Sequence, residues 1–300
     1  MTDNIYGFPP EDIVGPTTGA RQFSPLVPGS EPLEAVEPGS LETLTILGPP
    51  GTIERRYAIA LGLRALKPGG RLTVLAPKDK GGSRLASDLE SLGCEFDETS
   101  KRHHRICVTR GPGDAVAVAQ AIEDGAPRFV EEMGLWSQPG VFSWNRIDPG
   151  SALLLEHLPP QSGKGADLGA GLGVLTHAIL MSPKVVSVVL LDIDRRAVEL
   201  AKRNVSDPRA QFLWADARKT SELAGLDFIV MNPPFHEGGH EDQALGQTFI
   251  QTAARMLRNG GMCWLTANRH LPYERTLKPA FKRVSLIAEA GGYKIYQAQK

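Results

Sequence analysis

Three alternating glycines between a predicted strand and a predicted helix constrain the fold of this chain more than any other feature. They lie in Asp167-Leu168-Gly169-Ala170-Gly171-Leu172-Gly173, and the helix is expected over 174–181. Glycine lets the backbone turn sharply and approach a ligand closely. Such a loop at the end of a strand is typical of open α/β folds, which bind ligands at the carboxyl ends of parallel strands.

The second half of the chain alternates between strand and helix patterns. Helical stretches are expected between the first six strands, whereas four residues, Glu289-Ala290-Gly291-Gly292, join the last two. That link is too short for a crossover helix, so the last pair is expected to be antiparallel. We therefore predict a Rossmann-like α/β fold, in which one sheet is parallel apart from one reversed strand. Its seven strands are expected at 165–168, 185–191, 211–215, 227–231, 262–266, 284–288 and 294–297.

The first half resembles the second. Ala65–Leu75 parallels Met256–Leu265, and Leu47-Gly48-Pro49-Pro50 parallels Met231-Asn232-Pro233-Pro234. Strands at 44–47, 72–75 and 105–108 alternate with helices at 53–66 and 83–92, which favours a mostly parallel sheet. If the halves are duplicates, the first copy has lost the glycine loop and the Asn. The expected domains are an irregular acidic arm over 1–40, a smaller degenerate α/β domain over 41–130, and a domain with the glycine loop over 131–300.

Acidic residues follow three successive strands of the second half. Asp167 heads a G-x-G-x-G loop, unlike the G-x-G-x-x-G of nicotinamide and flavin sites, and suits an ammonium better than a pyrophosphate. Asp192 stands where a carboxylate accepts from ribose hydroxyls, and Asp216 can accept from an adenine amine. Asp194 is expected to cap the next helix. The ordered set predicts bound S-adenosylmethionine, with Asp167, Gly169, Ala170, Gly171, Gly173, Asp192, Ile193, Asp216, Ala217 and Asn232 as cofactor-binding residues.

The fourth strand of that half ends in Asn232-Pro233-Pro234-Phe235-His236. An exocyclic amine on a base or an amide is a poor nucleophile because its lone pair is delocalised. The Asn232 side-chain oxygen and the Pro233 carbonyl can accept from its two N–H groups, which aims the lone pair at a sulfonium methyl. Pro233 and Pro234 stiffen the turn, and Phe235 can stack on a planar base. These four residues are the predicted catalytic residues, and they act mainly by positioning.

No metal site is expected. His236-Glu237-Gly238-Gly239-His240 fits the H-E-x-x-H pattern of zinc proteases, which requires both histidines on one helical face. Two consecutive glycines disfavour that helix by about 1 kcal/mol each.

Net charge excludes nucleic-acid binding through an overall positive charge, because 33 basic residues face 34 acidic ones. The charge is uneven, however: residues 251–300 carry nine bases and two acids, and Lys101-Arg102-His103-His104-Arg105 contains no acid. Either stretch is a solvated face or a surface that meets phosphates. Three cysteines without a C-x-x-C pair, and no apolar run of the ~20 residues that span a bilayer, favour a cytoplasmic protein without a membrane partner.

Taken together, these motifs resemble the bacterial small-subunit ribosomal RNA guanine-N2 methyltransferase family. The resemblance is specific over about 138–300 and weaker over 40–130. It implies an S-adenosylmethionine-dependent enzyme in which Asn232 to Phe235 hold the target guanine, and a degenerate first domain that binds no cofactor. Further matching stretches are Gly140-Val141-Phe142-Ser143, Asp148-Pro149-Gly150-Ser151 and Ala267-Asn268-Arg269-His270-Leu271-Pro272-Tyr273.

Two alternatives remain at this stage. A methyltransferase of the same fold could act on adenine N6 or on a protein glutamine, since both present a planar amino group. A non-catalytic RNA-binding or ribosome-assembly factor could keep the fold, although the intact glycine loop, Asp192 and Asn232 argue against it. The expected partner is ribosomal RNA or a ribosomal subunit. A monomer is expected, because two fused similar halves could replace a dimer.

Overall fold

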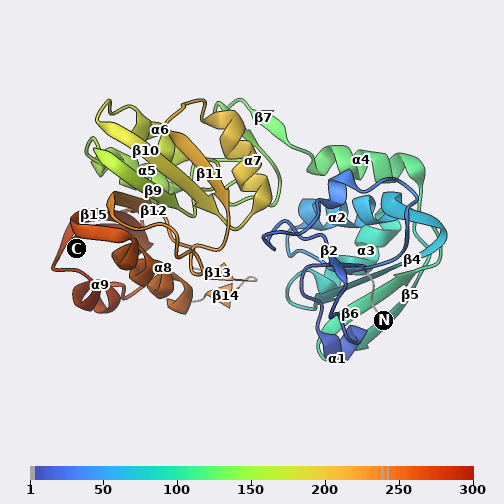
Figure 1. Ribbon diagram of the computed structural model, residues 1–300. Coiled ribbons are helices and arrows are strands. Elements are labelled where there is room, and N and C mark those ends of the chain that lie inside the picture. Colours follow the sequence, from blue (N-terminus) through green and yellow to red (C-terminus); the bar gives the residue numbers. More distant parts are fainter. Residues whose placement is uncertain (1–3, 235, 238–239, 242) are drawn as a thin grey trace. The chain divides into compact units, whose positions relative to one another are not determined.

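The computed structural model describes residues 4–234, 236–237, 240–241 and 243–300. The chain forms two compact units (Figure 1). The first runs to Pro127 and takes in Gln138–Gly140, and the second comprises Arg128–Ser137 and Val141–Lys300. None of the described helices is long and apolar enough to cross a membrane.

The second unit is built on a seven-stranded sheet with the strand order β11-β10-β9-β12-β15-β17-β16. β17 runs antiparallel to both of its neighbours, β15 and β16. The neighbouring strands from β11 to β15 in this order pair in parallel, which confirms the predicted topology. The elements of this unit are β7 (Arg128–Val130), β8 (Leu135–Ser137), α5 (Pro149–His157), β9 (Gly163–Leu168), α6 (Val174–Leu180), β10 (Val185–Asp192), α7 (Arg195–Asn204), β11 (Ala210–Trp214), β12 (Leu226–Met231), β13 (His236–Glu237), β14 (His240–Glu241), α8 (Gln243–Met256), β15 (Leu257–Asn268), α9 (Glu274–Ala280), β16 (Arg283–Ala290) and β17 (Tyr293–Gln299).

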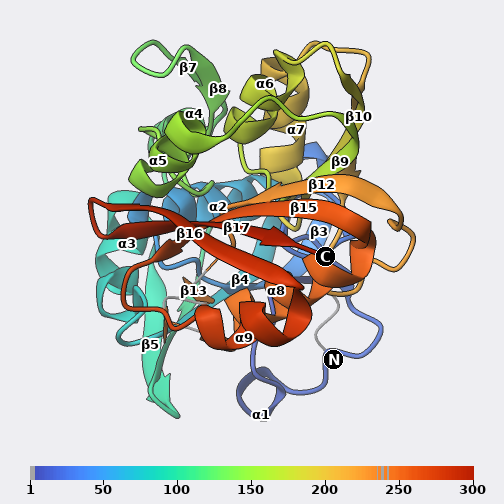
Figure 2. The same ribbon diagram turned by 90° about the vertical axis from the view of Figure 1, so that its left-hand side faces the viewer.

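Both faces of this sheet are covered by helices (Figures 1 and 2). On one face, α5 and α6 bury Leu154 and Ile179 against alternate sheet residues such as Phe228. On the other face, α8 and α9 bury Ile250 and Leu277 against the intervening ones. Because successive strand residues point to opposite faces, strands buried on both sides are apolar almost throughout. The ends of the strands are therefore where polar residues of a functional site can lie.

The first unit has a six-stranded sheet with the order β2-β1-β3-β4-β6-β5. Its core lies between the sheet and α2, α3 and α4, with Ile46, Leu72 and Val74 fully buried from the strand side. The elements are β1 (Asn4–Tyr6), α1 (Glu11–Val14), β2 (Arg21–Gln22), the 3₁₀ helix η1 (Leu33–Ala35), β3 (Leu41–Leu47), α2 (Thr52–Ala65), β4 (Leu66–Pro77), the 3₁₀ helix η2 (Gly82–Arg84), α3 (Leu85–Ser91), β5 (Phe96–Lys101), β6 (His104–Thr109) and α4 (Ala115–Gly125).

Five strands of the first sheet repeat five strands of the second. The neighbours β1-β3-β4-β6-β5 match β9-β12-β15-β17-β16 in order and in direction, and α2 stands between β3 and β4 as α8 does between β12 and β15. Both β4 and β15 pair at their first residue, skip the glycine pair and resume at the sixth. This repeated topology supports a duplication.

Two expectations need correction. Residues 4–40 are not wholly irregular, because β1 and β2 join the first sheet through backbone pairing. The first sheet is mostly parallel as expected, and its one reversed strand is β6, which runs antiparallel to β4 and β5. No helix forms between β11 and β12; residues 215–225 instead make turns in which the amides of Lys219 and Thr220 both bond to the Asp216 carbonyl.

Candidate active site

The glycine loop leaves β9 in a conformation that favours glycine. Gly169, Gly171 and Gly173 have φ values of 72°, 54° and 83°, in the left-handed region that L-residues with side chains rarely adopt. The amides of Gly169 and Ala170 both bond to the Leu191 carbonyl, which ties the loop to β10. A Cβ on Gly171 would meet nothing within 4 Å, so the middle of the loop is open to a ligand.

Asp167 is fully buried at the end of β9. Thr176 of α6 donates its hydroxyl proton to Oδ2 at 2.7 Å, whereas Oδ1 is buried without a hydrogen-bond partner among the described residues. The pKa of this carboxyl is raised to about 7, mainly by burial and to a smaller extent by the neighbouring Asp192, whereas the bond from Thr176 works to lower it. A buried acceptor without a donor suits a cationic ligand group.

Asp192 ends β10 directly beside the glycine loop. Its Oδ2 accepts from the Gly171 amide and its Oδ1 from the Asp194 amide, each at 2.8 Å. Burial raises the pKa of Asp192 to about 6, although these backbone bonds work in the opposite direction. Asp194 caps α7 as expected, with Oδ1 accepting from the Arg196 amide. The Ile193 carbonyl between them accepts from the Trp214 indole at 2.8 Å.

Asp216 lies just beyond β11, where the Ala215 amide bonds to the Asp192 carbonyl. Its carboxylate is bound by Arg218, through the backbone amide at 2.9 Å and the guanidinium Nε at 2.8 Å. Burial works to raise the pKa of Asp216, but the bonds from Arg218 outweigh it and the pKa lies below its ordinary value. No pattern in the sequence signals this ion pair. Ala217 is buried in the core beside α8.

Asn232 and Pro233 follow β12 and lie next to the glycine loop. The space that a Cβ on Gly169 would take lies 3.9 Å from both the Asn232 carbonyl oxygen and Pro234 Cδ. The Asn232 Nδ2 donates to Asp148 Oδ1 at 2.8 Å and to Ser151 Oγ at 2.9 Å. Within the described part of the chain, nothing donates to the Asn232 Oδ1 or to the Pro233 carbonyl. Phe235, the fourth predicted catalytic residue, lies outside the described residues.

Asp148 and Ser151 were not among the predicted site residues. The Asp-Pro-Gly-Ser pattern carries the signal of a helix start, and Asp148 is indeed the N-cap of α5. Their contact with Asn232, 84 and 81 positions away, has no sequence signal.

The chemistry of these residues fits S-adenosylmethionine. The Asp167 oxygen that no described residue donates to suits the amino group of its amino-acid part, and the open Gly171 leaves room for close approach. Asp192 retains acceptor capacity, because each carboxylate oxygen can accept more than one hydrogen bond. The four strand ends thus bring together the predicted residues from Asp167 to Pro234 at one edge of the sheet.

The H-E-x-x-H segment has no helical backbone in its described part. His236–Glu237 and His240–Glu241 form two short strands that pair antiparallel. The described backbone therefore does not provide the helical face on which the zinc-protease pattern needs both histidines.

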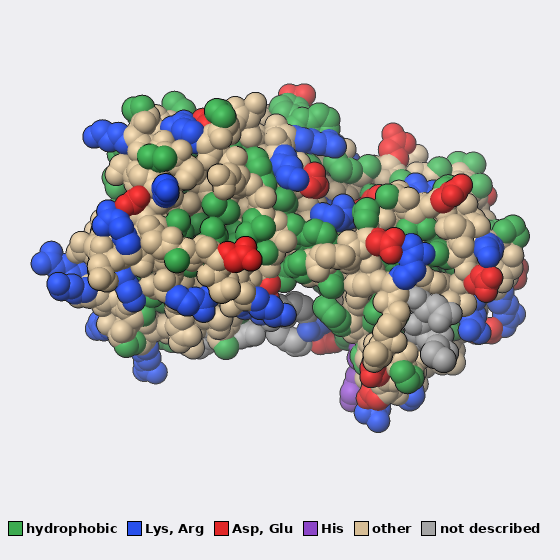
Figure 3. Space-filling model, in the orientation of Figure 1, with side chains coloured by type: hydrophobic (Ala, Val, Ile, Leu, Met, Phe, Trp, Pro, Cys, Tyr) green, Lys and Arg blue, Asp and Glu red, His purple; other side chains and the backbone are tan. Residues whose placement is uncertain are grey.

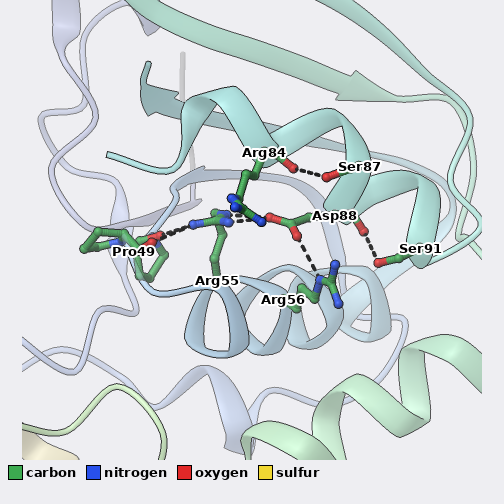
Figure 4. Close-up of polar contacts among 8 residues, drawn as sticks. Pro49, Arg55, Arg56, Arg84, Ser87, Asp88 and Ser91 are labelled. Carbon is green, nitrogen blue, oxygen red and sulfur yellow. Dashed lines mark hydrogen bonds and ion pairs between the residues drawn. The ribbon is translucent and has the colours of Figure 1, made fainter. Parts of the chain in front are cut away.

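In the first unit, the sheet edge that corresponds to the candidate site is filled by a side chain of that same unit, Arg55. Strand register places Ile5 and Leu47 where the second unit has Asp167 and Asn232. This register differs by one residue from the Pro-Pro correspondence read from the sequence. Arg55 of α2, fully buried, donates to the carbonyls of Pro49 and Pro50 at 3.0 and 2.9 Å (Figure 4).

Arg55 is held there by Asp88, itself buried, through Nε and Nη2, each 2.6 Å from Oδ2. Arg56 binds the other oxygen of Asp88 at 2.8 Å (Figure 4). A Cβ on Gly81 would lie 2.3 Å from Arg55 Nη1, so the guanidinium fills the space beside Gly81 in the loop that follows β4.

The two basic stretches differ in how their charges are used. In the Lys101–Arg105 cluster, Arg102 and Arg105 form ion pairs with Asp12 and Glu98, and Lys101 Nζ donates to the Asp12 carbonyl. Lys and Arg side chains also stand out around the C-terminal part of the second unit (Figure 3). There, the described residues provide no ion pair for four exposed cations, Arg275, Lys278, Lys282 and Arg283.

Comparison with known proteins gives a consistent result. Residues 132–297 match the model of the methyltransferase small domain family. The ribosomal RNA small subunit methyltransferase C of Shewanella loihica is 33% identical over 81% of this chain and 73% of that protein. The Shewanella sediminis protein of the same name is 30% identical over 92% and 80%. A solved T. thermophilus 16S rRNA N2 G1207 methyltransferase, in complex with AdoMet and guanosine, superposes with a TM-score of 0.77 at 25% identity, covering 100% of this chain and 88% of that one.

Proposed function

The chain belongs to the ribosomal RNA small subunit methyltransferase C family, and on this basis we propose that it transfers a methyl group from S-adenosylmethionine to the N2 amino group of a guanine in small-subunit ribosomal RNA. A match over the whole chain to an enzyme solved with AdoMet and guanosine supports both the cofactor and the acceptor. The observation that carries the proposal is the placement of Asn232, whose backbone carbonyl lies beside the glycine loop and whose side-chain oxygen accepts no hydrogen bond from a described residue.

The cofactor supplies an electrophilic methyl group on a sulfonium. Asp167 binds its amino group, the loop from Gly169 to Gly173 lets the backbone approach it, and Asp192 accepts from its ribose. Asp216 and Ala217 border the adenine, and the Arg218 ion pair holds the Asp216 carboxylate in place. Asp167, Asp192 and Asp216 would each set a carboxylate against hydrogen-bond donors of the cofactor.

Asn232 Oδ1 and the Pro233 carbonyl accept from the two N–H groups of the guanine amine. This hydrogen bonding would turn the nitrogen lone pair toward the methyl group. The nitrogen would gain the methyl group as the S–C bond breaks and would lose one proton to solvent, with S-adenosylhomocysteine as the second product. Pro233 and Pro234 fix the backbone around these acceptors, since each ring locks its own φ. The rate then comes from positioning and desolvation, which can contribute about 7–11 kcal/mol to lowering a barrier. Phe235 is proposed to stack on the target base.

We propose that the exposed cations around α9 and β16 bind RNA phosphates, and that a splayed-out base enters the site. The Lys101–Arg105 cluster contributes less, because internal pairing already uses its arginine charges. The enzyme is proposed to act in the cytoplasm on ribosomal RNA or a small ribosomal subunit, as a monomer in which the first unit supplies the scaffold.

Methyl transfer from labelled S-adenosylmethionine tests the proposal. Ribosomal RNA, free and within small subunits, is incubated with the protein, and the product nucleosides are identified by mass spectrometry. N2-methylguanosine is the expected product. N6-methyladenosine or labelled protein would show that the acceptor is an adenine or a protein and not guanine N2. Absence of methyl transfer together with absence of cofactor binding would leave a non-catalytic RNA-binding role.

A further inference from the structure

We propose that Asp148 and Ser151 are positioning residues, which hold the Asn232 carboxamide so that its oxygen, and not its NH₂ group, faces the target amine. The inference rests on the proposed function, because it assigns two further residues to the same site. Neither residue is proposed to touch the substrate or the cofactor.

Both N–H groups of Asn232 are occupied by acceptors. Asp148 Oδ1 lies 2.8 Å and Ser151 Oγ 2.9 Å from Nδ2. Rotating the carboxamide by 180° would place its oxygen against the Asp148 carboxylate and would leave both acceptors without that donor. A carboxylate can only accept, so the observed orientation is the one that this pair allows.

The two acceptors are themselves fixed by the start of α5. Asp148 caps the helix, and its Oδ1 also accepts from the Ser151 amide at 2.9 Å. Gly150 lies against Tyr293 of β17, where a Cβ would come within 2.6 Å of the ring. One carboxylate oxygen therefore joins the end of β12 to a helix that is packed on the sheet.

The orientation matters because of the donor pattern of the acceptor substrate. An exocyclic amine presents two N–H donors, and only an acceptor can hold them. A carboxamide free to rotate would present N–H donors to those N–H groups for part of the time. Loss of Asp148 should therefore lower kcat while cofactor binding, made by other residues, is retained.

The first test compares Asp148→Ala with Asp114→Ala. Asp114 caps α4 in the same way, with its Oδ1 accepting from the Ala117 amide at 2.8 Å, but it lies in the first unit. We expect Asp148→Ala to lower kcat about ten- to hundredfold, the range for removing one partner of a charged hydrogen bond. The dissociation constant of S-adenosylmethionine should stay within about twofold. Asp114→Ala should leave kcat unchanged.

Two conservative variants keep the test decisive if Asp148→Ala does not fold. Asp148→Asn retains an Oδ1 that can accept from both donors, so it should keep kcat within about fivefold of the wild type. Ser151→Ala removes one of two acceptors and should lower kcat about three- to tenfold. Unchanged kcat in both Asp148→Ala and Ser151→Ala, or in Ser151→Ala alone where Asp148→Ala is unfolded, would overturn the proposal.

The effect of Asp148→Ala on kcat should change sign in the Asn232→Asp background, and this distinguishes a positioning role of Asp148 from a merely structural one. In the Asn232→Asp variant two carboxylates lie side by side, so adding Asp148→Ala should raise kcat by removing their repulsion. A merely structural role for Asp148 would lower kcat by the same factor in both backgrounds, which would contradict the inference. Product identity is read separately: a methylated nucleoside other than N2-methylguanosine would refute the acceptor assignment without deciding the role of Asp148.

Discussion

Asp167 is the predicted site residue whose ionisation is most strongly affected by its surroundings. Its carboxyl is fully buried, its pKa is raised to about 7, and one of its oxygens has no donor among the described residues. An ordinary aspartate has a pKa of about 3.9. Between about pH 4 and 7 the folded protein therefore binds more protons at Asp167 than the unfolded chain does, and the stability contributed by this group falls as pH rises through that window.

The same shift predicts pH-dependent cofactor binding. A cationic amino group favours the ionised carboxylate, so binding below pH 7 must release the Asp167 proton. We expect the dissociation constant of S-adenosylmethionine to fall by up to about tenfold per pH unit between pH 5 and 7, and then to level off. Titration calorimetry in two buffers of different ionisation enthalpy measures both the affinity and the released proton.

Asp167→Asn is the control for this effect. It removes the titrating group but keeps the hydrogen bond to Thr176 possible, so its weaker binding should lose most of the pH dependence, leaving the part due to Asp192. An affinity of the wild type that does not change from pH 5 to 8 would show that Asp167 does not bind the charged group.

At this scale the sequence predicts the positions of residues better than their contacts. The strand-loop-helix pattern was sufficient to place Asp167 and Asp192 at strand ends and the three glycines in the loop after β9, because glycine and acid at a strand end have a local cause. The partners of those residues were not predictable. The contacts of Asp148 and Ser151 with Asn232 depend on where separate elements meet in the folded chain. Arg218 lies only two positions from Asp216, but no sequence pattern marks the turn that joins their side chains.

Among the elements, the loop between β9 and α6 shows how backbone conformation and packing act together. Gly173 is the N-cap of α6 and has a φ of 83°, and a Cβ there would lie 2.9 Å from Val205 Cγ2 at the end of α7. Gly171 also has a positive φ, but a Cβ there would meet nothing within 4 Å. A side chain at Gly171 would therefore carry the cost of the left-handed backbone alone, whereas one at Gly173 would add the cost of a steric clash.

Alanine at these two positions should give different losses of stability. Gly171→Ala carries the left-handed cost alone, about 1–2 kcal/mol. Gly173→Ala adds a steric clash and should cost about 2–4 kcal/mol in total. Urea unfolding measures both free energies. Equal losses would mean that α7 moves away freely and that the packing of α6 on α7 is loose.

Element boundaries were predictable where burial imposes a pattern, and less so elsewhere. β5 was missed because five of its six residues are exposed, so no apolar alternation marks it. The helix expected between β11 and β12 does not form, since Asp216 and Arg218 form a local turn with side-chain bonds to the backbone. Such local bonds compete with helix formation.

For the whole molecule, the repeated topology explains why one chain has two similar sheets but one intact site. In the first unit Ile5 and Leu47 stand where the second unit has Asp167 and Asn232. The buried Arg55–Asp88 pair fills the space beside the loops that follow β3 and β4. We predict that the chain binds one S-adenosylmethionine. Calorimetry should give a stoichiometry of one, and Asp167→Ala should weaken that single event; a second event that survives in the variant would show a working site in the first unit.

RNA binding should depend on salt through the exposed cations around α9 and β16. Alanine at Lys278, Lys282 and Arg283 together should reduce the slope of log affinity against log salt concentration by about 0.7–0.9 for each phosphate that the variant no longer neutralises. Alanine at Lys101, Arg102 and Arg105 is the matched control, because two of these charges are paired internally. A larger reduction of the slope in the control than in the second-unit variant would place the RNA on the hairpin of β5 and β6.

The Asn232→Ala variant provides the most direct measurement of the central claim, that the end of β12 positions a guanine amine beside a cofactor held by the glycine loop. Cofactor affinity and N2-methylguanosine formation are measured on the same preparation. The account predicts binding of S-adenosylmethionine within severalfold of the wild type and a reduction of methyl transfer by at least about a hundredfold, the order expected when a positioning group is removed. Wild-type turnover to N2-methylguanosine in this variant would contradict it.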